Sequence, residues 1–335
     1  MGQFKYYAII ILFLFYSCDI YRDSIGADNE LMVLASDKHK ESAVSFLEKI
    51  FNDTIFTPQP EPVYKIKFAK PEKFSKLKRQ SNLVILSLGN DIRTGGTKLT
   101  RNLLGKKKFL ETLSGDNHII LSENQFAKNQ LFMIISALDE QLMMESLDGQ
   151  ENWIKSLFEE KYDRRQKSYL FRDARQNDFE NKLMENYGWN IKIPWGWEKI
   201  NEAPDSNLVW LGKEFPYQWF CVSWKEKTNT LDSSSVVEKV FEFPLEIFKT
   251  IQFDNYMFRL LRGDGRSWYD WKATGIWESI DEPKGGPFSL FFKFDELNQR
   301  VFIINTLIHY PGENKSNYMR QMELMSSTIR FEKIN

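Results

Sequence analysis

The tryptophans divide this sequence into two parts. Nine of the ten tryptophans lie between Trp189 and Trp277, and only Trp153 lies outside that span. A buried aromatic side chain removes about 150–250 Å² of surface from water, so a dense group of them builds a core of its own. The chain has 335 residues, and that length suggests about two domains. We therefore predict two structural units, the second of them rich in tryptophan.

Strands and helices are predicted to alternate in the first unit, residues 30–175. Pro58, Pro60 and Pro62 favour an extended connector within it, and residues 89–115 are expected to be mostly loop. This alternation predicts an α/β or α+β sandwich. The strand candidates are residues 30–36, 63–68, 82–88, 118–122 and 130–137, and helical patterns follow near 37–52, 71–77 and 139–170.

The second unit, residues 178–335, begins with a helical stripe that ends at Gly188. Large apolar residues alternate over 288–294, which is typical of a half-buried strand. We predict an antiparallel sheet with helices packed on one face, so that the fold class is α+β with two α/β sandwich units. The strand candidates are residues 189–193, 207–211, 219–224, 273–278, 288–294 and 301–309, with helices near 233–251 and 316–328.

The N-terminus has the pattern of a bacterial lipoprotein signal peptide. Lys5 is the only charge in residues 1–17, and residues 6–16 are continuously apolar. That run is about half the ~20 residues that a membrane-spanning helix needs. A small residue and then Cys18 follow, and a lipoprotein cysteine receives acyl groups such as palmitate at this place. We predict a signal peptide over 1–17, lipid attachment at Cys18 and a polar tether over 18–29; an ordinary secretory peptide or a short membrane anchor is the alternative.

These features predict a protein of the cell envelope that is held to the membrane by lipid on Cys18. The formal net charge of −1 gives no electrostatic reason to expect a nucleic-acid partner, and none is predicted. Two cysteines are too few for a disulfide framework or a cysteine-based metal site. His39, His118 and His309 lie far apart and form no zinc-binding motif. No cofactor and no metal is predicted.

Several segments resemble an uncharacterised family of envelope lipoproteins, domain of unknown function 4837, found mainly in Bacteroidota. The resemblance runs through nearly all of residues 30–332 and departs from the family pattern at Ile276 and Lys284. It implies an anchored envelope protein and brings no known activity or catalytic residue. Residues 189–332 are also similar to the PsbP/Mog1-like α/β/α sandwich, and such a likeness of fold does not fix function. The resembling segments are 59–62 (QPEP), 126–130, 207–211 (NLVWL), 275–278 (GIWE), 284–288 (KGGPF) and 318–325 (YMRQMELM).

A ligand surface is predicted near the last tryptophans and a glycine turn. Exposed rings at Trp268, Trp271 and Trp277 would stack on sugar faces, and packing in the core is the alternative. Gly285 and Gly286 would let a ligand approach the backbone closely, and a tight turn before strand 288–294 is the alternative. The sequence has no nucleophile elbow and no phosphate-binding P-loop, so no catalytic residue is predicted.

The function predicted from the sequence is therefore a membrane-anchored envelope lipoprotein that is a binding or structural component of a protein complex, and not an enzyme. One alternative is a glycan or peptidoglycan binder, which requires two of the three named tryptophans to be exposed and roughly coplanar. The other alternative is an envelope hydrolase. A hydrolase requires a deep pocket with convergent acids or a histidine. A deep polar pocket around His309 or Glu278 would therefore support this alternative.

Overall fold

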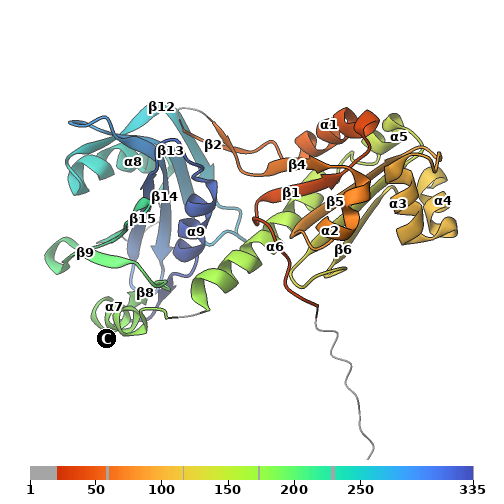
Figure 1. Ribbon diagram of the computed structural model, residues 1–335. Helices are drawn as coiled ribbons and strands as arrows, with labels where there is room; N and C mark the ends of the chain where they lie inside the picture. Colours follow the sequence, from red (N-terminus) through yellow and green to blue (C-terminus); the bar gives the residue numbers. More distant parts are fainter. Residues whose placement is uncertain (1–20, 58–59, 116, 173, 228–230, 335) are drawn as a thin grey trace, which may run out of the picture.

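The computed structural model describes residues 21–57, 60–115, 117–172, 174–227 and 231–334, which form two domains joined by a long helix (Figure 1). The predicted signal peptide and Cys18 lie outside these residues. Within the described ranges, no helix is both long enough and apolar enough to cross a membrane. The joining helix, α6 (Glu151–Phe171), begins on the N-terminal domain, and a short loop leads from it to α7 (Asn177–Tyr187) on the C-terminal domain.

The N-terminal domain contains a mixed five-stranded sheet. Its strand order is β4-β1-β5-β7-β6, in which the first four strands are parallel and β6 is antiparallel to β7. Every residue of β5 and β7 is buried, as expected for parallel strands that are covered on both faces. The strands are β1 (Glu30–Leu34), β4 (Lys65–Ala69), β5 (Asn82–Leu88), β6 (Ile119–Glu123) and β7 (Leu131–Ala137).

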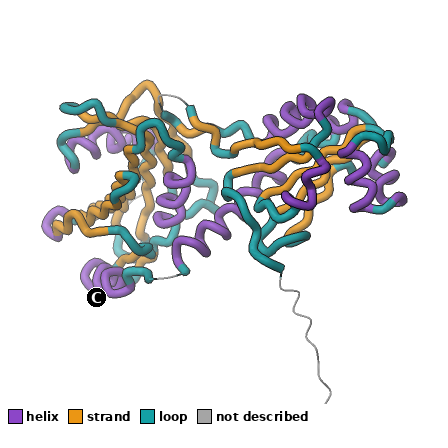
Figure 2. The backbone as a smooth tube through the Cα atoms, in the orientation of Figure 1, coloured by secondary structure: helices purple, strands orange, loops and turns teal. Residues whose placement is uncertain are grey.

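Helices cover both faces of this sheet (Figure 2). One face packs against α1 (Lys40–Ile50), α5 (Glu140–Glu145) and α6. The other face packs against α2 (Phe74–Leu77), α3 (Gly95–Leu104) and α4 (Lys106–Ser114). The expectation of mostly loop over residues 89–115 was wrong, because Gly95 and Gly96 open α3 and Gly105 is the N-cap of α4. Short 3₁₀ turns occupy Asp37–His39 and Pro71–Lys73.

The predicted tether over residues 18–29 is not free along its whole length. The Ser24 N–H donates to the Lys128 carbonyl at 2.9 Å, and the Ile25 N–H donates to the Arg79 carbonyl at 2.9 Å. Further on, Asp28 Oδ1 lies 2.7 Å from Arg165 Nε of α6. From residue 22 onward, backbone hydrogen bonds and the Asp28 carboxylate therefore bind the later part of the predicted tether to the N-terminal domain.

An arm of the N-terminal domain reaches the C-terminal domain where the proline-rich connector was predicted. Two short strands, β2 (Thr54–Ile55) and β3 (Glu61–Pro62), pair with each other in this arm. Ile55 packs against the core of the C-terminal domain. The guanidinium carbon of Arg259 lies 4.4 Å from the centre of the Phe56 ring. The connector is therefore a second contact between the domains, besides α6.

The C-terminal domain contains a seven-stranded antiparallel sheet in the order β12-β13-β14-β15-β11-β10-β9. The long central strands β14 and β15 are buried along most of their length. The strands are β9 (Glu198–Ala203), β10 (Leu208–Lys213), β11 (Tyr217–Glu226), β12 (Ile251–Arg262), β13 (Trp271–Ser279), β14 (Gly285–Asp295) and β15 (Arg300–His309), and β8 (Trp189–Asn190) pairs separately with β16 (Arg330–Phe331); a 3₁₀ turn occupies Pro204–Ser206.

Helices lie on both faces of this second sheet as well. α7 and α9 (Ser316–Ser326) pack on the face that carries Phe291, whereas α8 (Ser233–Ile247) packs on the face that carries Phe292. The α+β fold class with two sandwich units is confirmed, and the expectation of helices on one face only is corrected. Strand 288–294 is buried rather than half-buried because both of its alternating sets include large aromatic residues.

Polar contacts join the two domains along α6 and α9. Arg320 Nε of α9 donates to Asp163 Oδ1 of α6 at 2.7 Å, and the Tyr162 hydroxyl donates to Asn317 Oδ1 at 2.5 Å. Beside them, Gln321 Nε2 donates to Gln166 Oε1 at 2.8 Å. The domains are therefore held against each other by specific polar pairs, and the arm adds apolar contacts.

Candidate functional site

A pocket of about 260 Å³ opens at one end of the C-terminal sheet. The starts of β11 and β12 and the ends of β13 and β15 lie at this end of the sheet, so four strands contribute lining residues, and Lys284 just before β14 adds another. This convergence follows from antiparallel pairing, in which Tyr217 at the start of β11 lies opposite His309 at the end of β15. The lining residues are Tyr217, Trp219, Thr250, Ile251, Trp277, Ser279, Glu282, Lys284, Leu307 and His309.

Two tryptophans form the aromatic wall of this pocket. The rings of Trp219 and Trp277 are nearly parallel, with centres 6.4 Å apart and planes 24° apart. Trp219 also stacks on Phe248, with ring centres 5.5 Å apart. Ligand pockets in proteins are lined mainly by apolar and aromatic side chains with a few polar groups among them. This aromatic wall is therefore better suited to an apolar or aromatic group of a ligand than to a charged group.

A glycine fixes the position of the Trp277 ring. Trp277 is buried, and its indole Nε1–H donates to the Ile308 carbonyl at 3.1 Å. A Cβ atom on Gly286 would lie 2.1 Å from that same carbonyl oxygen and 3.3 Å from Trp277 Nε1. Only glycine at position 286 therefore leaves room for the strand pairing and for the indole hydrogen bond together.

His309 presents a hydrogen-bond acceptor at the edge of the pocket. Its Nδ1 lies 2.9 Å from the Gly285 carbonyl oxygen. Because a carbonyl only accepts, Nδ1 carries the proton, and Nε2 of the neutral ring keeps its lone pair. The ring also meets the edge of Trp277, with ring centres 6.2 Å apart. His309 is thus oriented by a backbone group and can accept a hydrogen bond from a ligand.

The acids around the pocket are already paired. Glu282 forms an ion pair with Lys284, and that hydrogen bond raises the pKa of the Lys284 ammonium group. Glu278 Oε1 accepts a hydrogen bond from Gln252 Nε2 at 2.7 Å. In the described residues, no group of three or more His, Cys, Asp or Glu side chains is placed to hold a metal ion. Among the residues that line the pocket itself, Glu282 is the one carboxylate.

The pocket continues into a wider cleft of about 1050 Å³ beneath the arm. Thr57 and residues 60–62 of the arm form one wall, and the loop 310–315 forms another. Glu61 closes the far side of this cleft: its carboxylate accepts from the Lys315 N–H at 2.7 Å and lies 2.5 Å from Lys315 Nζ. The cleft is therefore shared between the two domains, whereas the pocket belongs to the C-terminal domain alone.

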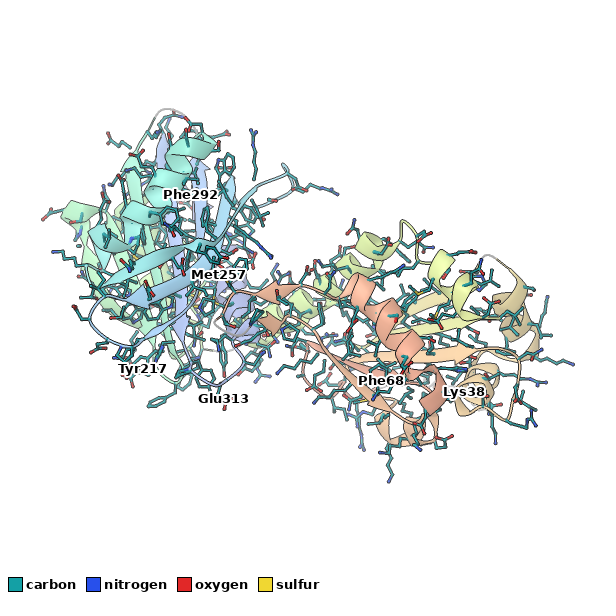
Figure 3. The ribbon with its side chains drawn as sticks, turned by 90° about the horizontal axis from the view of Figure 1, so that it is seen from above. Lys38, Phe68, Tyr217, Met257, Phe292 and Glu313 are labelled. Atoms are coloured by element: carbon teal, nitrogen blue, oxygen red, sulfur yellow. The ribbon has the colours of Figure 1, made fainter. Side chains whose placement is uncertain are left out.

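Exposed aromatic side chains stand beside the pocket. Tyr217, which lines it, is 56% exposed, and Phe215 in the preceding hairpin is 88% exposed. Figure 3 shows Tyr217 and Glu313 at the same edge of the C-terminal domain. We call Phe215 and Tyr217 the aromatic rim.

The structure separates the residues of the predicted ligand surface. Trp277, Gly285 and Gly286 line the cleft. Trp268 lies on the opposite face of the sheet, where its ring packs 4.7 Å from that of Phe291. Trp271 lies six residues from Trp277 along β13, about 20 Å away at the strand rise, and its Nε1–H donates to the Leu231 carbonyl at 3.0 Å. The expected shared surface is corrected, because these tryptophans pack into two different cores and none of the three is exposed.

Sequence reasoning missed the residues that complete the pocket and its rim. Phe215, Tyr217 and Trp219 lie next to an apolar segment that was interpreted as core, and Cys221 in that segment is indeed fully buried. Burial raises the pKa of the Cys221 thiol. Tyr217 could have been identified from its position opposite His309 on the neighbouring strand, but the register that pairs them is known only from the structure.

Two family models match the chain, one for each domain. Residues 24–170 match a domain of unknown function (DUF8532), and residues 176–328 match a domain of unknown function (DUF4837). The resemblance to the second family is confirmed over 176–328, and a different family model covers the N-terminal domain. No curated protein matches this chain.

Three solved structures are similar to part of the chain at low TM-scores. A point mutant of the protein Mog1 is 11% identical, with a TM-score of 0.32 over 44% of this chain and 92% of Mog1. The Saccharomyces cerevisiae Ran-binding protein Mog1p is 11% identical, with a TM-score of 0.32 over 44% of this chain and 91% of its own. A structure from Bacteroides thetaiotaomicron is 7% identical, with a TM-score of 0.24 over 44% of this chain and 46% of that chain. These likenesses add nothing to the question of function.

Proposed function

We propose that this chain, whose C-terminal part is a DUF4837 domain, is a lipid-anchored envelope protein that binds a protein partner through its aromatic pocket and rim. One observation carries the proposal: the pocket walled by Trp219 and Trp277 opens beside the exposed rings of Phe215 and Tyr217. Aromatic residues are enriched at protein interfaces, and a buried aromatic anchor in a pocket supplies much of the binding energy. The protein acts by binding and carries out no reaction.

The predicted lipid anchor at the N-terminus determines where in the cell the protein would act. Three acyl chains on Cys18 would hold the protein at a membrane, since each buried CH₂ contributes about 0.8 kcal/mol. In the described residues, backbone hydrogen bonds bind the chain from Arg22 onward to the N-terminal domain. Four residue steps separate Cys18 from Arg22 and span at most ~14 Å. Lipid on Cys18 therefore places the N-terminal domain near the bilayer, while α6 carries the C-terminal domain and its pocket.

Glycan binding is the second candidate, and the polar groups of the pocket favour it. Thr250, Ser279 and Nε2 of His309 offer hydrogen bonds next to an aromatic wall. A sugar ring needs both, because its hydroxyl groups form hydrogen bonds and its face stacks on aromatic rings. The two alternatives differ in whether Phe215 contributes to binding. A protein partner would cover Phe215, whereas a single sugar ring would contact only the pocket.

The test is a quantitative pull-down of the full-length, tagged and lipidated protein from detergent-solubilised envelopes. The test variant carries Phe215→Ser and Tyr217→Ser, and the matched control carries Tyr256→Ser, a residue of β12 that is 90% exposed. We expect a defined partner to be recovered with the wild type and the control and to be lost with the test variant. Identical recovery with all three proteins would contradict the proposal.

A second measurement separates the glycan alternative. Purified peptidoglycan fragments are titrated against the wild type, the rim variant Phe215→Ser and the pocket variant His309→Ala. Saturable binding that His309→Ala weakens and Phe215→Ser leaves unchanged would assign the pocket to a sugar ring. If the pocket binds a protein partner as proposed, we expect the peptidoglycan fragments not to bind.

The anchoring is tested separately with Cys18→Ser. We expect metabolic labelling with palmitate to mark the wild-type protein and not the variant, and we expect the variant to leave the membrane fraction. Retention of an unlabelled Cys18→Ser protein in the membrane would support the short-anchor alternative.

A further inference from the structure

Positive charge is concentrated in one stretch of the N-terminal domain. Residues 70–115 contain eleven Lys and Arg against three Asp and Glu, whereas the other residues of the chain contain 34 Lys and Arg against 43 Asp and Glu. The total of −1 is therefore the sum of a part with net charge +8 and a remainder with net charge −9. A surface dominated by one sign of charge attracts partners of the opposite sign.

The fold places these charges on one face of the N-terminal domain. α2, α3 and α4 lie on the face of the sheet opposite α6, and Phe74 and Leu99 turn their side chains toward the sheet. The lysines of these helices and of the 3₁₀ turn before α2 are exposed, and none of those named below forms an ion pair with another described residue. We call these lysines the basic face: Lys73, Lys76, Lys98, Lys106, Lys107 and Lys108.

The first turn of α4 carries charges that do not favour a helix. Lys106, Lys107 and Lys108 are its first three residues, and no acidic residue lies in that turn. Cations are unfavourable at a helix N-terminus, because the positive end of the helix dipole lies there. Leu110 on the same helix is 47% exposed, and basic side chains beside exposed apolar ones are typical of surfaces that bind a membrane interface. Binding therefore explains these lysines better than helix stability does.

The segment that leads to the predicted lipid anchor is bound beside α2. Arg79, two residues after α2, donates from Nη2 to the Asp23 carbonyl at 2.7 Å. Figure 1 shows the described chain beginning, in red, below α2 and β6. The chain between Cys18 and Arg22 spans at most ~14 Å. Lipid on Cys18 would therefore hold α2 close to the bilayer surface, where attraction to anionic headgroups acts over about 8–10 Å.

We propose that the basic face binds the anionic headgroups of the membrane that holds the lipid anchor. The inference rests on the anchoring in the proposed function, because the anchor is what brings these lysines to a lipid surface rather than to a soluble partner. An acyl anchor together with a basic surface binds a membrane more firmly than either does alone. Since α6 lies on the opposite face of the sheet, the C-terminal domain would stay free to bind its partner.

The test measures energy transfer from the basic face to the bilayer in the full-length, lipidated protein. Azidophenylalanine takes the place of Asn102, an exposed residue of α3, and carries the donor fluorophore, so that no cysteine is modified. The vesicles contain an acceptor-labelled lipid in phosphatidylcholine alone or in equal parts of phosphatidylcholine and phosphatidylglycerol. We expect more transfer in the anionic vesicles, and we expect high salt to remove the increase by screening the lysines. Equal transfer in both kinds of vesicle would overturn the proposal.

Substitutions in α4 show whether its lysines cause the increase. The triple variant Lys106→Gln, Lys107→Gln, Lys108→Gln changes only exposed side chains. We expect it to shift the equilibrium toward the undocked domain on the order of a hundredfold, so that the increase in transfer disappears. Arginine at the same three positions keeps the charge and should keep the increase. An increase that survives in the glutamine variant would overturn the proposal.

A matched control removes the same number of charges from the C-terminal domain. The variant Lys225→Gln, Lys227→Gln, Lys333→Gln also changes only exposed lysines. We expect its energy transfer from position 102 to equal that of the wild type. If this control lost the increase as well, the total charge of the protein would be responsible and the basic face would not be a specific site.

Vesicle flotation separates this proposal from the lipid anchor. A protein that does not float with neutral vesicles would contradict the anchor. Its flotation with anionic vesicles, lost in the glutamine variant of α4, would still support the basic face. Retention on heparin that the same variant loses, without an increase in transfer in anionic vesicles, would assign the face to a soluble polyanion and overturn the membrane proposal.

Discussion

The N-terminal sheet is largely parallel and the C-terminal sheet is antiparallel throughout, and the two sheets place different chemistry at their ends. At the carboxyl ends of β1, β4 and β5, loops lead into helices, and a crevice of about 420 Å³ there is lined mainly by charged and polar side chains. At the end of the antiparallel sheet, strands start and stop side by side, so the pocket there is walled by aromatic side chains. Strand direction therefore explains why charged and polar side chains gather at the end of one sheet and aromatic side chains at the end of the other.

The two sheets nevertheless share one property: each is covered by packed residues on both faces. The largest predicted effect tests this for the C-terminal sheet. Phe291 and Phe292 are neighbours on β14, and both are fully buried, one in each core of the C-terminal domain. We expect Phe291→Ala and Phe292→Ala each to lower the free energy of unfolding by about 3–5 kcal/mol. Urea denaturation followed by tryptophan fluorescence measures this. A cost below about 0.5 kcal/mol for either variant, as at a surface position, would show that the sheet is covered on one face only.

A smaller effect compares the close backbone contacts of the two domains. A Cβ on Gly96 or on Gly286 would meet a backbone carbonyl oxygen, at 2.4 Å and 2.1 Å respectively. Backbone moves less readily than a flexible side chain, so we expect Gly96→Ala and Gly286→Ala each to cost about 1–3 kcal/mol. Gly286→Ala should in addition shift the fluorescence of Trp277 and weaken partner binding. If Gly286→Ala left binding unchanged, the Trp277 wall would not be part of the site.

The smallest effect contrasts the caps of two helices. Asp232 caps α8: its carboxylate accepts from the Ser235 N–H at 2.8 Å and from the Ser234 hydroxyl at 2.7 Å. The backbone hydrogen bond from Ser235 is the largest cause that lowers the pKa of Asp232 to about 2. Because the folded-state pKa lies below the unfolded value of about 3.9, the cap stabilises the fold above pH ~4 and loses this effect as the pH falls toward 2.

Thermal unfolding as a function of pH checks this contrast. We expect Asp232→Ala to lower the melting temperature at pH 7 and to match the wild type progressively below pH ~4. Thr94→Val at the cap of α3 should change the free energy of unfolding by no more than about 0.5 kcal/mol, because its hydroxyl makes no hydrogen bond in the fold. A large loss of stability in Thr94→Val would mean that the hydroxyl has a structural partner and would remove the contrast.

The sequence was sufficient to predict most strands, because their apolar runs are bounded by turns. Residues 82–88 and 130–137 were predicted as strands and correspond to β5 and β7. Burial on both faces could not be predicted for residues 288–294, because alternation of large aromatics with residues such as Ser289 and Lys293 resembles a half-exposed strand. Helices on the second face became evident only from the packing of α8 against β12 and its neighbours.

The candidate sites were less predictable than the fold, for a physical reason. Trp277 and the two glycines were chosen from local sequence, and they do line the cleft. Tyr217 and His309 become neighbours only through strand register, which depends on contacts between distant parts of the chain.

Photo-crosslinking in living cells tests the proposed partner site most directly. The photoreactive residue benzoylphenylalanine is placed at position 217 of the lipidated protein, where Tyr217 lines the pocket, and at position 256 of a control, where Tyr256 is exposed on β12. We predict one discrete crosslinked protein from position 217 that is absent from position 256. No crosslinked protein from position 217, or the same products from both positions, would contradict the account.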